Sequence, residues 1–500
     1  MSLLQPIKPV KPARIGLYSV GLQAYWVQFP GLRERLIGYG EFLASQMQGY
    51  GEVFNFGLVD TPACGLAAGE WFNSRNVDLI FCHSATYVTS DCVLPVHQVC
   101  KAPVVVLNLQ PAPRINYDRT TTGEWLAHCG ACPTPELANA FNRAGIPVRF
   151  ISGLLGLAET PAISLTDERS ADRPEAIRAQ RLIKEYILAA RVKRNLLGSR
   201  FGFLGNNYSG MLDMYSDFTL IAARTGIHVE ILEMCDLDAC LRQVTETEVA
   251  EKLQQIEAMF IISEDSPADP IARRPSTEQL AWAARVAAAQ ERLVRERDLD
   301  ALSYYYHGAP GGEYEQLQSG FISGHSLLTA RGVPCSGEGD LKTNVAMKIC
   351  DLLETGGSYS EIVVTDYIDK TILMGHDGPF HIAIAEGKPI LRGLGLYHGK
   401  QGSGVSVEAK VRRGPVTLLG LTQTREDGIK LIISEGESTD GPIMKIGNTQ
   451  TPIRFALDPD AYFEKWLLEA PTHHCAMAVG HNAGLFEKVA ALLDIRAVQI

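Results

Sequence analysis

Short apolar runs alternate with helical stretches along the first third of the chain. The run at 14–20 leads into a helical stretch, and the runs at 77–83 and 103–109 are continuously apolar and are bounded by polar residues or proline. Strands that are buried on both faces of a parallel sheet have this pattern, because helices cover both faces. The pattern therefore predicts an α/β domain over residues 1–155.

A second series of alternating elements follows a long helical stretch at 173–197. Continuous apolar runs predict strands, and apolar residues at helical spacing predict helices. On this basis we expect a second α/β domain at 156–340, with strands at 200–204, 228–232 and 301–306 and helices at 217–225 and 277–297.

The pattern changes after residue 340. An amphipathic helix is expected at 341–353, and a last one at 485–493. Between them, short β-like runs at 405–411, 416–421 and 429–434 are separated by Gly, Pro and Asp-Gly turns. The third domain, 341–500, is therefore expected to be mainly β. The predicted fold class is α/β, with two Rossmann-like α/β domains followed by a C-terminal antiparallel β-barrel-like domain.

The composition is that of an ordinary globular protein. Of 500 residues, 46% are hydrophobic and 21% charged, and the formal net charge is −11. This acidic balance argues against a protein that binds nucleic acid or an anionic membrane surface, since both favour a basic face. No apolar run approaches the roughly 18 residues of a membrane span, and the first residues do not resemble a signal peptide.

Cysteine usage favours a reducing compartment. The eleven cysteines are an odd number and are scattered widely, so we expect reduced thiols and a cytoplasmic protein. Cys129 and Cys132 have the C-x-x-C spacing of a zinc half-site, but no second pair follows at a suitable distance. We interpret this pair as structural.

Candidate chemistry is concentrated between Tyr304 and His381, where carboxylates and imidazoles recur at the edges of apolar segments. Two carboxylates and one or two histidines can hold a divalent metal that polarises substrate oxygens. This donor mixture suits Mn²⁺, Co²⁺, Fe²⁺ or Zn²⁺ better than Ca²⁺. The chain has no phosphate-binding P-loop and no nucleophile elbow, which argues against nucleotide and acyl-transfer chemistry.

Each candidate also has a structural interpretation. Glu338, between two glycines, could simply favour the start of the following helix. Glu361 could be a solvent-facing strand residue. His376, His381 and one of the pair at 473–474 could be satisfied by hydrogen bonds in the core. Residue type and spacing alone therefore leave the metal site open.

Four segments together resemble the L-arabinose isomerase family, within the L-fucose/L-arabinose isomerase superfamily. GEGDLKT at 337–343 resembles the family's Glu-Gly-Asp-Trp-Lys-Thr, with leucine in place of tryptophan. GGSYSE at 356–361 resembles Gly-Gly-Thr-Ser-Phe-Met-Glu. LMGH at 373–376 resembles Leu-Gly-Ser-His, and THHC at 472–475 resembles Ala-His-His-Thr. Their order and approximate spacing agree with the family's.

The resemblance implies a metal-dependent aldose–ketose isomerase that uses Mn²⁺, or Co²⁺ or another divalent ion, and an enediol intermediate. It implies that Glu338 and Glu361 transfer the protons. Asp366 competes with Glu361 for the matching position, and His473 competes with His474. The implied metal ligands are Glu338, Glu361, His376 and His474.

Two N-terminal segments extend the resemblance to the sugar. VGLQAYW at 20–26 resembles Gly-Ser-Gln-His-Leu-Tyr and implies a substrate-binding role for Gln23. AHCG at 127–130 resembles Ala-His-Gly-Gly and implies the same for His128. Tryptophans at 26 and 125 depart from the family's sequence in these two segments. The resemblance therefore leaves the sugar open: it implies L-arabinose, converted to L-ribulose, or another aldose such as L-fucose, D-galactose or D-arabinose.

The family's members are hexamers with active sites shared between subunits, so the resemblance also implies a homo-oligomer. The only other partner expected is the sugar. Two further hypotheses are a catalytically silent sugar-binding relative and a metal-dependent hydrolase or epimerase.

Overall fold

The computed structural model describes residues 4–266, 268–308, 311–394, 396–397, 400–401 and 404–500. The chain divides into two compact units. The N-terminal unit is Lys11–Arg194, and the C-terminal unit comprises Met1–Val10 and Asn195–Ile500. The second of these units contains both the expected central α/β region and the expected β region. The domain boundaries drawn at 155 and 340 stay a prediction.

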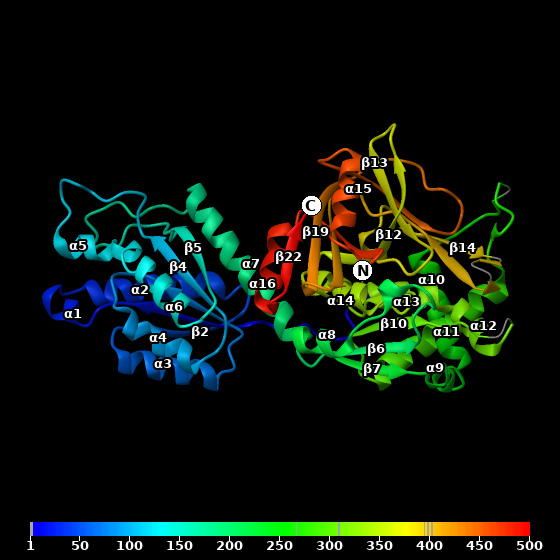
Figure 1. Cartoon of the computed structure of the whole chain (residues 1–500), viewed down its shortest axis with the longest axis horizontal. Helices are drawn as coiled ribbons and strands as arrows, with labels where there is room; N and C mark the ends of the chain where they lie inside the picture. Colours follow the sequence, from blue (N-terminus) through cyan, green and yellow to red (C-terminus); the bar gives the residue numbers. More distant parts are fainter. Residues whose placement is uncertain (1–3, 267, 309–310, 395, 398–399, 402–403) are drawn as a thin grey trace. The chain divides into compact units, whose positions relative to one another are not determined.

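The N-terminal unit is built on one five-stranded parallel sheet with the order β2-β1-β3-β4-β5 (Figure 1). In such sheets ligands bind beyond the carboxyl ends of the strands, where the strand order reverses. Here that point lies between β1 and β3. The strands are β1 (Arg14–Val20), β2 (Glu52–Val59), β3 (Leu79–His83), β4 (Val104–Gln110) and β5 (Val148–Leu154).

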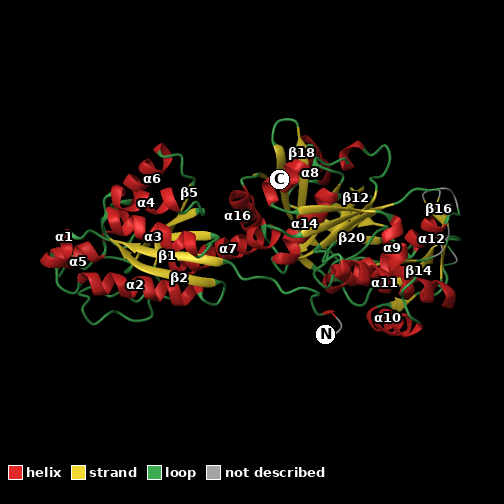
Figure 2. Cartoon of the chain, turned by 90° about the horizontal axis from the view of Figure 1, so that it is seen from below, coloured by secondary structure: helices red, strands yellow, loops and turns green. Residues whose placement is uncertain are grey.

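Helices cover both faces of this sheet. Figure 2 shows α3, α4 and α6 on one face and α2 on the other. A hydrophobic core joins the first face to the sheet and includes Phe72, Val96 and Phe141 from the three helices and Ile80 and Val106 from the strands. The helices are α1 (Ala24–Gln28), α2 (Leu32–Met47), α3 (Pro62–Ser74), α4 (Ser90–Val99), α5 (Thr122–Ala127), the 3₁₀ turn η2 (Cys129–Ala131), α6 (Thr134–Arg143) and α7 (Pro174–Leu196).

The C-terminal unit contains a four-stranded parallel sheet with the order β11-β10-β6-β7. Its strands are β6 (Arg200–Gly205), β7 (His228–Leu232), β10 (Ala301–Tyr305) and β11 (Cys335–Ser336). Three helices of this region begin with capping boxes, at Glu233, Thr245 and Ser276, which satisfy free backbone N–H groups. The helical elements are η3 (Leu212–Met214), α8 (Phe218–Thr225), α9 (Met234–Leu241), α10 (Glu246–Met259), α11 (Thr277–Glu296), α12 (Glu313–Ser319) and α13 (Phe321–Thr329).

Six antiparallel strands of the same unit form a closed barrel. The strand order is β18-β21-β12-β13-β20-β19, and β19 pairs again with β18 to close it. Closure leaves these strands without free edges. The barrel strands are β12 (Gly356–Asp366), β13 (Thr371–His376), β18 (Gly414–Thr424), β19 (Gly428–Ser438), β20 (Thr449–Phe455) and β21 (His474–Val479).

Helix α14 (Leu341–Leu352) joins the parallel sheet to the barrel. It packs against β12, β18 and β21 on the barrel and against β10 and β11 on the sheet. All its residues except Asp351 are buried. The turn that precedes α14 therefore lies where the sheet and the barrel meet.

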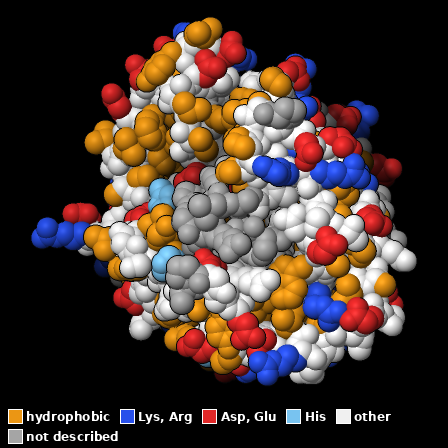
Figure 3. All heavy atoms as spheres, turned by 90° about the vertical axis from the view of Figure 1, so that its right-hand side faces the viewer, with side chains coloured by type: hydrophobic (Ala, Val, Ile, Leu, Met, Phe, Trp, Pro, Cys, Tyr) orange, Lys and Arg blue, Asp and Glu red, His pale blue; other side chains and the backbone are white. Residues whose placement is uncertain are grey.

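The remaining elements complete the C-terminal unit. They are β8 (Ile261–Ile262), β9 (Ala272–Arg273), η4 (Ile382–Ile384), β14 (Ile390–Leu394), β15 (Leu396–Tyr397), β16 (Lys400–Gln401), β17 (Val405–Glu408), α15 (Pro459–Leu468), α16 (Ala483–Leu493) and β22 (Arg496–Gln499). On the face shown in Figure 3, acidic and basic side chains are interspersed. Within the described part of the chain, no helix is both long and apolar enough to cross a bilayer.

The structure confirms a mixed α/β fold with parallel sheets and an antiparallel barrel. The strands expected at 14–20 and 228–232 have those bounds, and the helix expected at 173–197 is α7 (Pro174–Leu196). The expected strand at 405–411 is shorter than predicted, since β17 ends at Glu408.

Candidate metal and substrate site

Three of the predicted metal ligands lie on adjacent barrel strands. Glu361 on β12 is the direct register partner of His474, the first residue of β21. His376 ends β13, which pairs with β12 on its other side. The ring nitrogens His376 Nε2 and His474 Nε2 are 3.2 Å apart. One ligand atom from each of the three residues lies within 4.8 Å of the others.

Glu338 reaches the same place from the turn between β11 and α14. Its Oε2 lies 3.6 Å from His474 Nε2, and its Oε1 lies 3.9 Å from His376 Nε2. Its backbone has a φ of +59°, in the left-handed region that is unfavourable for a side chain. Such strain persists only where surrounding contacts impose it, and it is concentrated at functional sites.

The contacts that impose this turn come from two strands of the parallel sheet. Tyr208 N, beyond β6, donates to Glu338 O at 3.0 Å, and Gly339 N donates to Tyr304 O of β10 at 2.9 Å. Gly339 itself has a φ of +72°, and a Cβ there would lie 2.5 Å from Asn206 O. Only glycine fits at that position, which explains why glycine stands between Glu338 and Asp340.

The donor set fits a divalent cation. Two ligands each about 2.1 Å from one ion lie about 3.0–3.4 Å apart at octahedral or tetrahedral angles. The closest separations around His474, 3.2 and 3.6 Å, are near that range. Glu338 Oε2 is buried and has no hydrogen-bond partner among the described residues. Within that part of the chain, no lysine or arginine forms an ion pair with Glu338 or Glu361.

The two imidazoles are held differently from behind. Asp340 Oδ2 lies 3.1 Å from His474 Nδ1 and can accept its proton, whereas His376 Nδ1 accepts from Gly378 N at 2.8 Å and lies 3.0 Å from Asp377 Oδ1. When a carboxylate accepts the Nδ1 proton, the lone pair of Nε2 is free to bind a metal. Tyr359 adds a third buried contact, because its hydroxyl lies 2.7 and 3.0 Å from the two ring nitrogens of His474.

The site's electrostatics keep Glu338 and Asp340 ionised. Burial raises the pKa of Glu338, but the nearby imidazoles of His473, His474 and His376 outweigh burial and hold this pKa below its ordinary value. Burial likewise raises the pKa of Asp340, and the contact with His474 brings it down to about 2. Burial lowers the pKa of His474, which favours the neutral imidazole that metal binding requires.

His473 forms a second group with Glu338 and His474. Its Nε2 lies 3.7 Å from Glu338 Oε2, and the three residues together could hold an ion. Its Nδ1 lies 2.6 Å from Asp213 Oδ2. Burial lowers the pKa of His473, but the contacts with Glu338 and Asp213 raise it to about 9. The predicted competitor of His474 is thus beside the cluster, on its more exposed side.

The other predicted competitor, Asp366, lies outside the cluster. It ends β12 at the tip of the β12–β13 hairpin, where its Oδ1 accepts from Ile368 N and Asp369 N at 2.9 Å each. It lies five positions beyond Glu361 along the strand, which corresponds to roughly 16 Å. The geometry favours Glu361 over Asp366 as a member of the cluster.

The two predicted sugar-binding residues belong to the N-terminal unit. Gln23 is exposed and immediately precedes α1, beyond the carboxyl end of β1. His128 is buried after α5. A Cβ at Gly123 of α5 would lie 3.2 Å from Phe29, the residue that follows α1, so the Gln23 segment lies close to the segment that leads to His128. The N-terminal unit therefore brings these two predictions together, at the end of the sheet where ligands bind.

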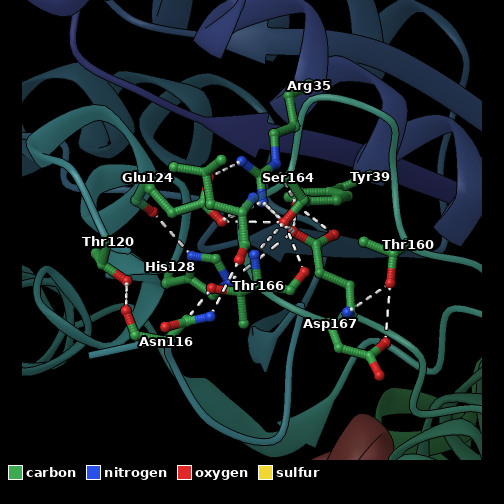
Figure 4. A network of polar contacts seen from close by, with 12 residues as sticks. Arg35, Tyr39, Asn116, Thr120, Glu124, His128, Thr160, Ser164, Thr166 and Asp167 are labelled. Atoms are coloured by element: carbon green, nitrogen blue, oxygen red, sulfur yellow. Dashed lines mark hydrogen bonds and ion pairs between the residues drawn. The ribbon is translucent and has the colours of Figure 1, made fainter. Parts of the chain in front are cut away.

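A buried ionic network surrounds His128 (Figure 4). Arg35 pairs with Glu168, and its Nη1 donates to Glu124 Oε2 at 2.7 Å. His128 Nδ1 donates to Glu124 O at 2.8 Å, and its Nε2 is buried without a hydrogen-bond partner among the described residues. Glu124, His128 and Glu168 have metal-like spacing. Because the Arg35 guanidinium already compensates both carboxylates, we interpret this network as structural support for His128.

Sequence reasoning missed several residues of both clusters. Asp340 lies inside a recognised segment, and its position after Glu-Gly was a usable signal. Asp213 had none, because 260 residues separate it from the His473 that it contacts. Arg35, Glu124 and Glu168 are equally dispersed.

No protein-family model matches the chain, and no curated protein matches it either. Two solved structures are similar to it over part of its length. One is an ABC transporter solute-binding protein from Agrobacterium vitis bound with alpha-D-tagatopyranose, with 13% identity over 65% of this chain and 93% of that chain. The other is the ligand-free, open form of a substrate-binding protein with adhesive properties from Clostridium difficile, with 12% identity over 68% of this chain and 95% of that chain. The TM-score is 0.15 for both, so neither likeness supports a function.

Proposed function

We propose that this protein is a metal-dependent aldose–ketose isomerase related to the L-arabinose isomerases. Its substrate would be L-arabinose, giving L-ribulose, or another aldose such as L-fucose, D-galactose or D-arabinose. The proposal includes the family's architecture of two Rossmann-like domains and a C-terminal barrel, and a cytoplasmic location.

The convergence of four dispersed residues carries this proposal. Glu338, Glu361 and His376 meet around His474. Glu338 comes from a turn, and the other three residues come from three different strands. Two carboxylates that form no ion pair with a lysine or arginine of the described residues fit a divalent ion and also an acid–base pair. A protein that only binds sugar has no need of this combination.

The residues of the chain would divide the work as follows. Glu338, Glu361, His376 and His474 would hold Mn²⁺, or Co²⁺ or a similar ion, which when bound polarises the carbonyl and adjacent hydroxyl oxygens of an open-chain sugar. One of the two glutamates would remove the proton on C2, and the other would help to return a proton to C1. Asp340 would keep the imidazole of His474 oriented, and the backbone N–H of Gly378 would hold that of His376.

Recognition of the sugar would involve the N-terminal unit. Gln23 and His128 lie at the ligand-binding end of its sheet, and in the related isomerases the active site is shared between subunits. We therefore propose a homo-oligomer, a hexamer as in the family, in which one copy's His128 faces a neighbour's metal site. Nucleic acid and membranes have no part in this proposal.

The test is a product assay on metal-stripped protein with and without added Mn²⁺. A panel of pentoses, hexoses and 6-deoxyhexoses would be incubated in D₂O and the products identified by NMR. Mn²⁺-dependent ketose with deuterium at C1 is expected. A stereoisomeric aldose or a cleavage fragment would instead identify an epimerase or hydrolase, and no product from folded, metal-loaded protein would favour a silent sugar-binding relative.

A matched pair of variants tests the role of Glu338. Glu338→Gln removes the charge and the proton acceptor, and turnover should fall by at least about 100-fold while the melting temperature is retained. Glu354→Gln is the control, because Glu354 also has a positive φ, +62°, and lies outside the cluster. Normal turnover in Glu338→Gln would exclude Glu338 as a catalytic residue.

A further inference from the structure

His473 differs from the other two imidazoles of the cluster in its accessibility. Its side chain is 36% exposed, whereas those of His376 and His474 are 5% and 0% exposed. It also lies beside Glu338 rather than among the strand residues. Of the three rings, this is the most accessible to a ligand from solvent.

One carboxylate oxygen holds both the backbone and the ring of this residue. Asp213 Oδ2 accepts from His473 N at 3.0 Å and lies 2.6 Å from His473 Nδ1. A backbone N–H can only donate, so this oxygen is an acceptor, and the ring donates its Nδ1–H to it. The contact therefore fixes the direction of the ring.

The loop that supplies Asp213 is itself anchored at the site. Asn207 Nδ2 donates to Gly339 O at 2.7 Å and to Met214 O at 3.1 Å. Lys342 Nζ donates to Ser216 Oγ at 3.1 Å. The loop between β6 and α8 is thus bound to the Glu338 turn and to the first residues of α14, and Asp213 is held rather than free to swing away.

We propose that Asp213 is a positioning residue that acts through His473. It orients the ring so that Nε2 faces the space next to Glu338 Oε2, where it would bind an oxygen of the open-chain sugar. The gap of 3.7 Å between Nε2 and Glu338 Oε2 is too long for a direct hydrogen bond, so both atoms are available to a ligand. This inference rests on the proposed isomerase function. It adds Asp213, from the loop after β6 of the parallel sheet, to the residues that determine how the sugar binds.

The first test reads the ring directly and does not need activity. Magic-angle-spinning NMR of histidine-labelled protein reports the hydrogen bond of each ring N–H through its proton chemical shift, and Gln in place of His473 identifies its signal. In the wild type the Nδ1–H proton should have the downfield shift of a proton donated to a carboxylate, and Asp213→Ala should lose that shift. Asp213→Asn should show a smaller change, because its amide oxygen can still accept. An unchanged Nδ1–H shift in Asp213→Ala would overturn the proposal.

The second test separates positioning from metal binding and from folding. Asp213→Ala should lower kcat/KM for the sugar by about 10- to 100-fold, with Asn intermediate, while the affinity for Mn²⁺ changes less than about 2-fold. Asp217→Asn in the same loop is the control, because Asn still caps α8 as Asp217 does. A fall in Mn²⁺ affinity that matches the fall in activity would make His473 a metal ligand and overturn the sugar-binding role. If the wild type isomerises no aldose, the proposed function fails, and the NMR result still decides whether Asp213 positions His473.

Discussion

Asp340 shows how one side chain serves local structure and the site together. Its Oδ1 accepts from Thr343 N at 3.0 Å and caps the start of α14, while its Oδ2 lies 3.1 Å from His474 Nδ1. The cap is a local interaction that sequence can suggest. The contact with His474 spans 134 residues and belongs to the tertiary structure.

Asparagine at this position should separate the two functions. In Asp340→Asn the amide oxygen can keep the cap, and the amide NH₂ then faces His474 Nδ1. The ring proton must move to Nε2, which can no longer bind a metal. We expect the Kd for Mn²⁺ to rise by about 10- to 100-fold with little change in melting temperature, as measured by isothermal titration calorimetry. An unchanged Kd would show that Asp340 does not orient His474.

At the scale of elements, the site depends on close approach of barrel strands. Gly375 on β13 is the register partner of Glu361 and precedes His376. A Cβ at Gly375 would lie 2.1 Å from Thr449 O on β20, a backbone atom that is held in the ladder. Glycine is required here so that β20 can pack closely behind the ligand strand.

The element-scale prediction compares two alanine substitutions. Gly375→Ala should destabilise the C-terminal unit by about 1–3 kcal/mol or more, because a backbone atom must shift, and it should weaken metal binding. Gly484→Ala in α16 should instead stabilise it by about 0.5–1 kcal/mol, since a Cβ there meets only Lys488 Nζ at 3.8 Å. Urea unfolding of both variants measures the difference. Equal stabilities would contradict the packing argument.

At the scale of the whole molecule, each compact unit has its own core and its own buried polar groups. In the N-terminal unit, His83 on β3 is buried and its Nδ1 lies 3.0 Å from Ser19 Oγ. Burial lowers its pKa from 6.5 to about 3. The unfolded chain therefore binds more protons than the folded chain between these two pH values, and stability falls as the pH falls through that window.

Removal of His83 should make the stability of the N-terminal unit less dependent on pH and should leave the C-terminal unit unchanged. For one such group the free energy of unfolding changes by about 1.4 kcal/mol per pH unit inside the window. In His83→Gln the slope should decrease by about this amount, as measured by hydrogen exchange of the β1 and β3 amides between pH 6.5 and 4. Exchange in the barrel strands serves as the internal control and should keep its slope. An unchanged slope in β1 and β3 would mean that His83 is not buried neutral in solution.

The sequence by itself determined most of the elements and the membership of the main cluster. Periodicity is local, so the strands at 14–20 and 228–232 and the helix α7 could be predicted from neighbouring residues. Four short segments also identified Glu338, Glu361, His376 and His474, through a resemblance rather than through spacing.

Tertiary structure alone decided which side chains meet. Closure of the barrel makes Glu361 and His474 register partners across more than a hundred residues, and the loop after β6 brings Asp213 to His473. The tertiary structure also favours Glu361 over Asp366 as a member of the cluster. Asp366 is the last residue of β12 and lies at the turn beyond it, away from the cluster. The physical reason is that helix and strand formation depend on near neighbours, whereas a polar site depends on which strands pair and how loops pack, and no short stretch of sequence carries that information.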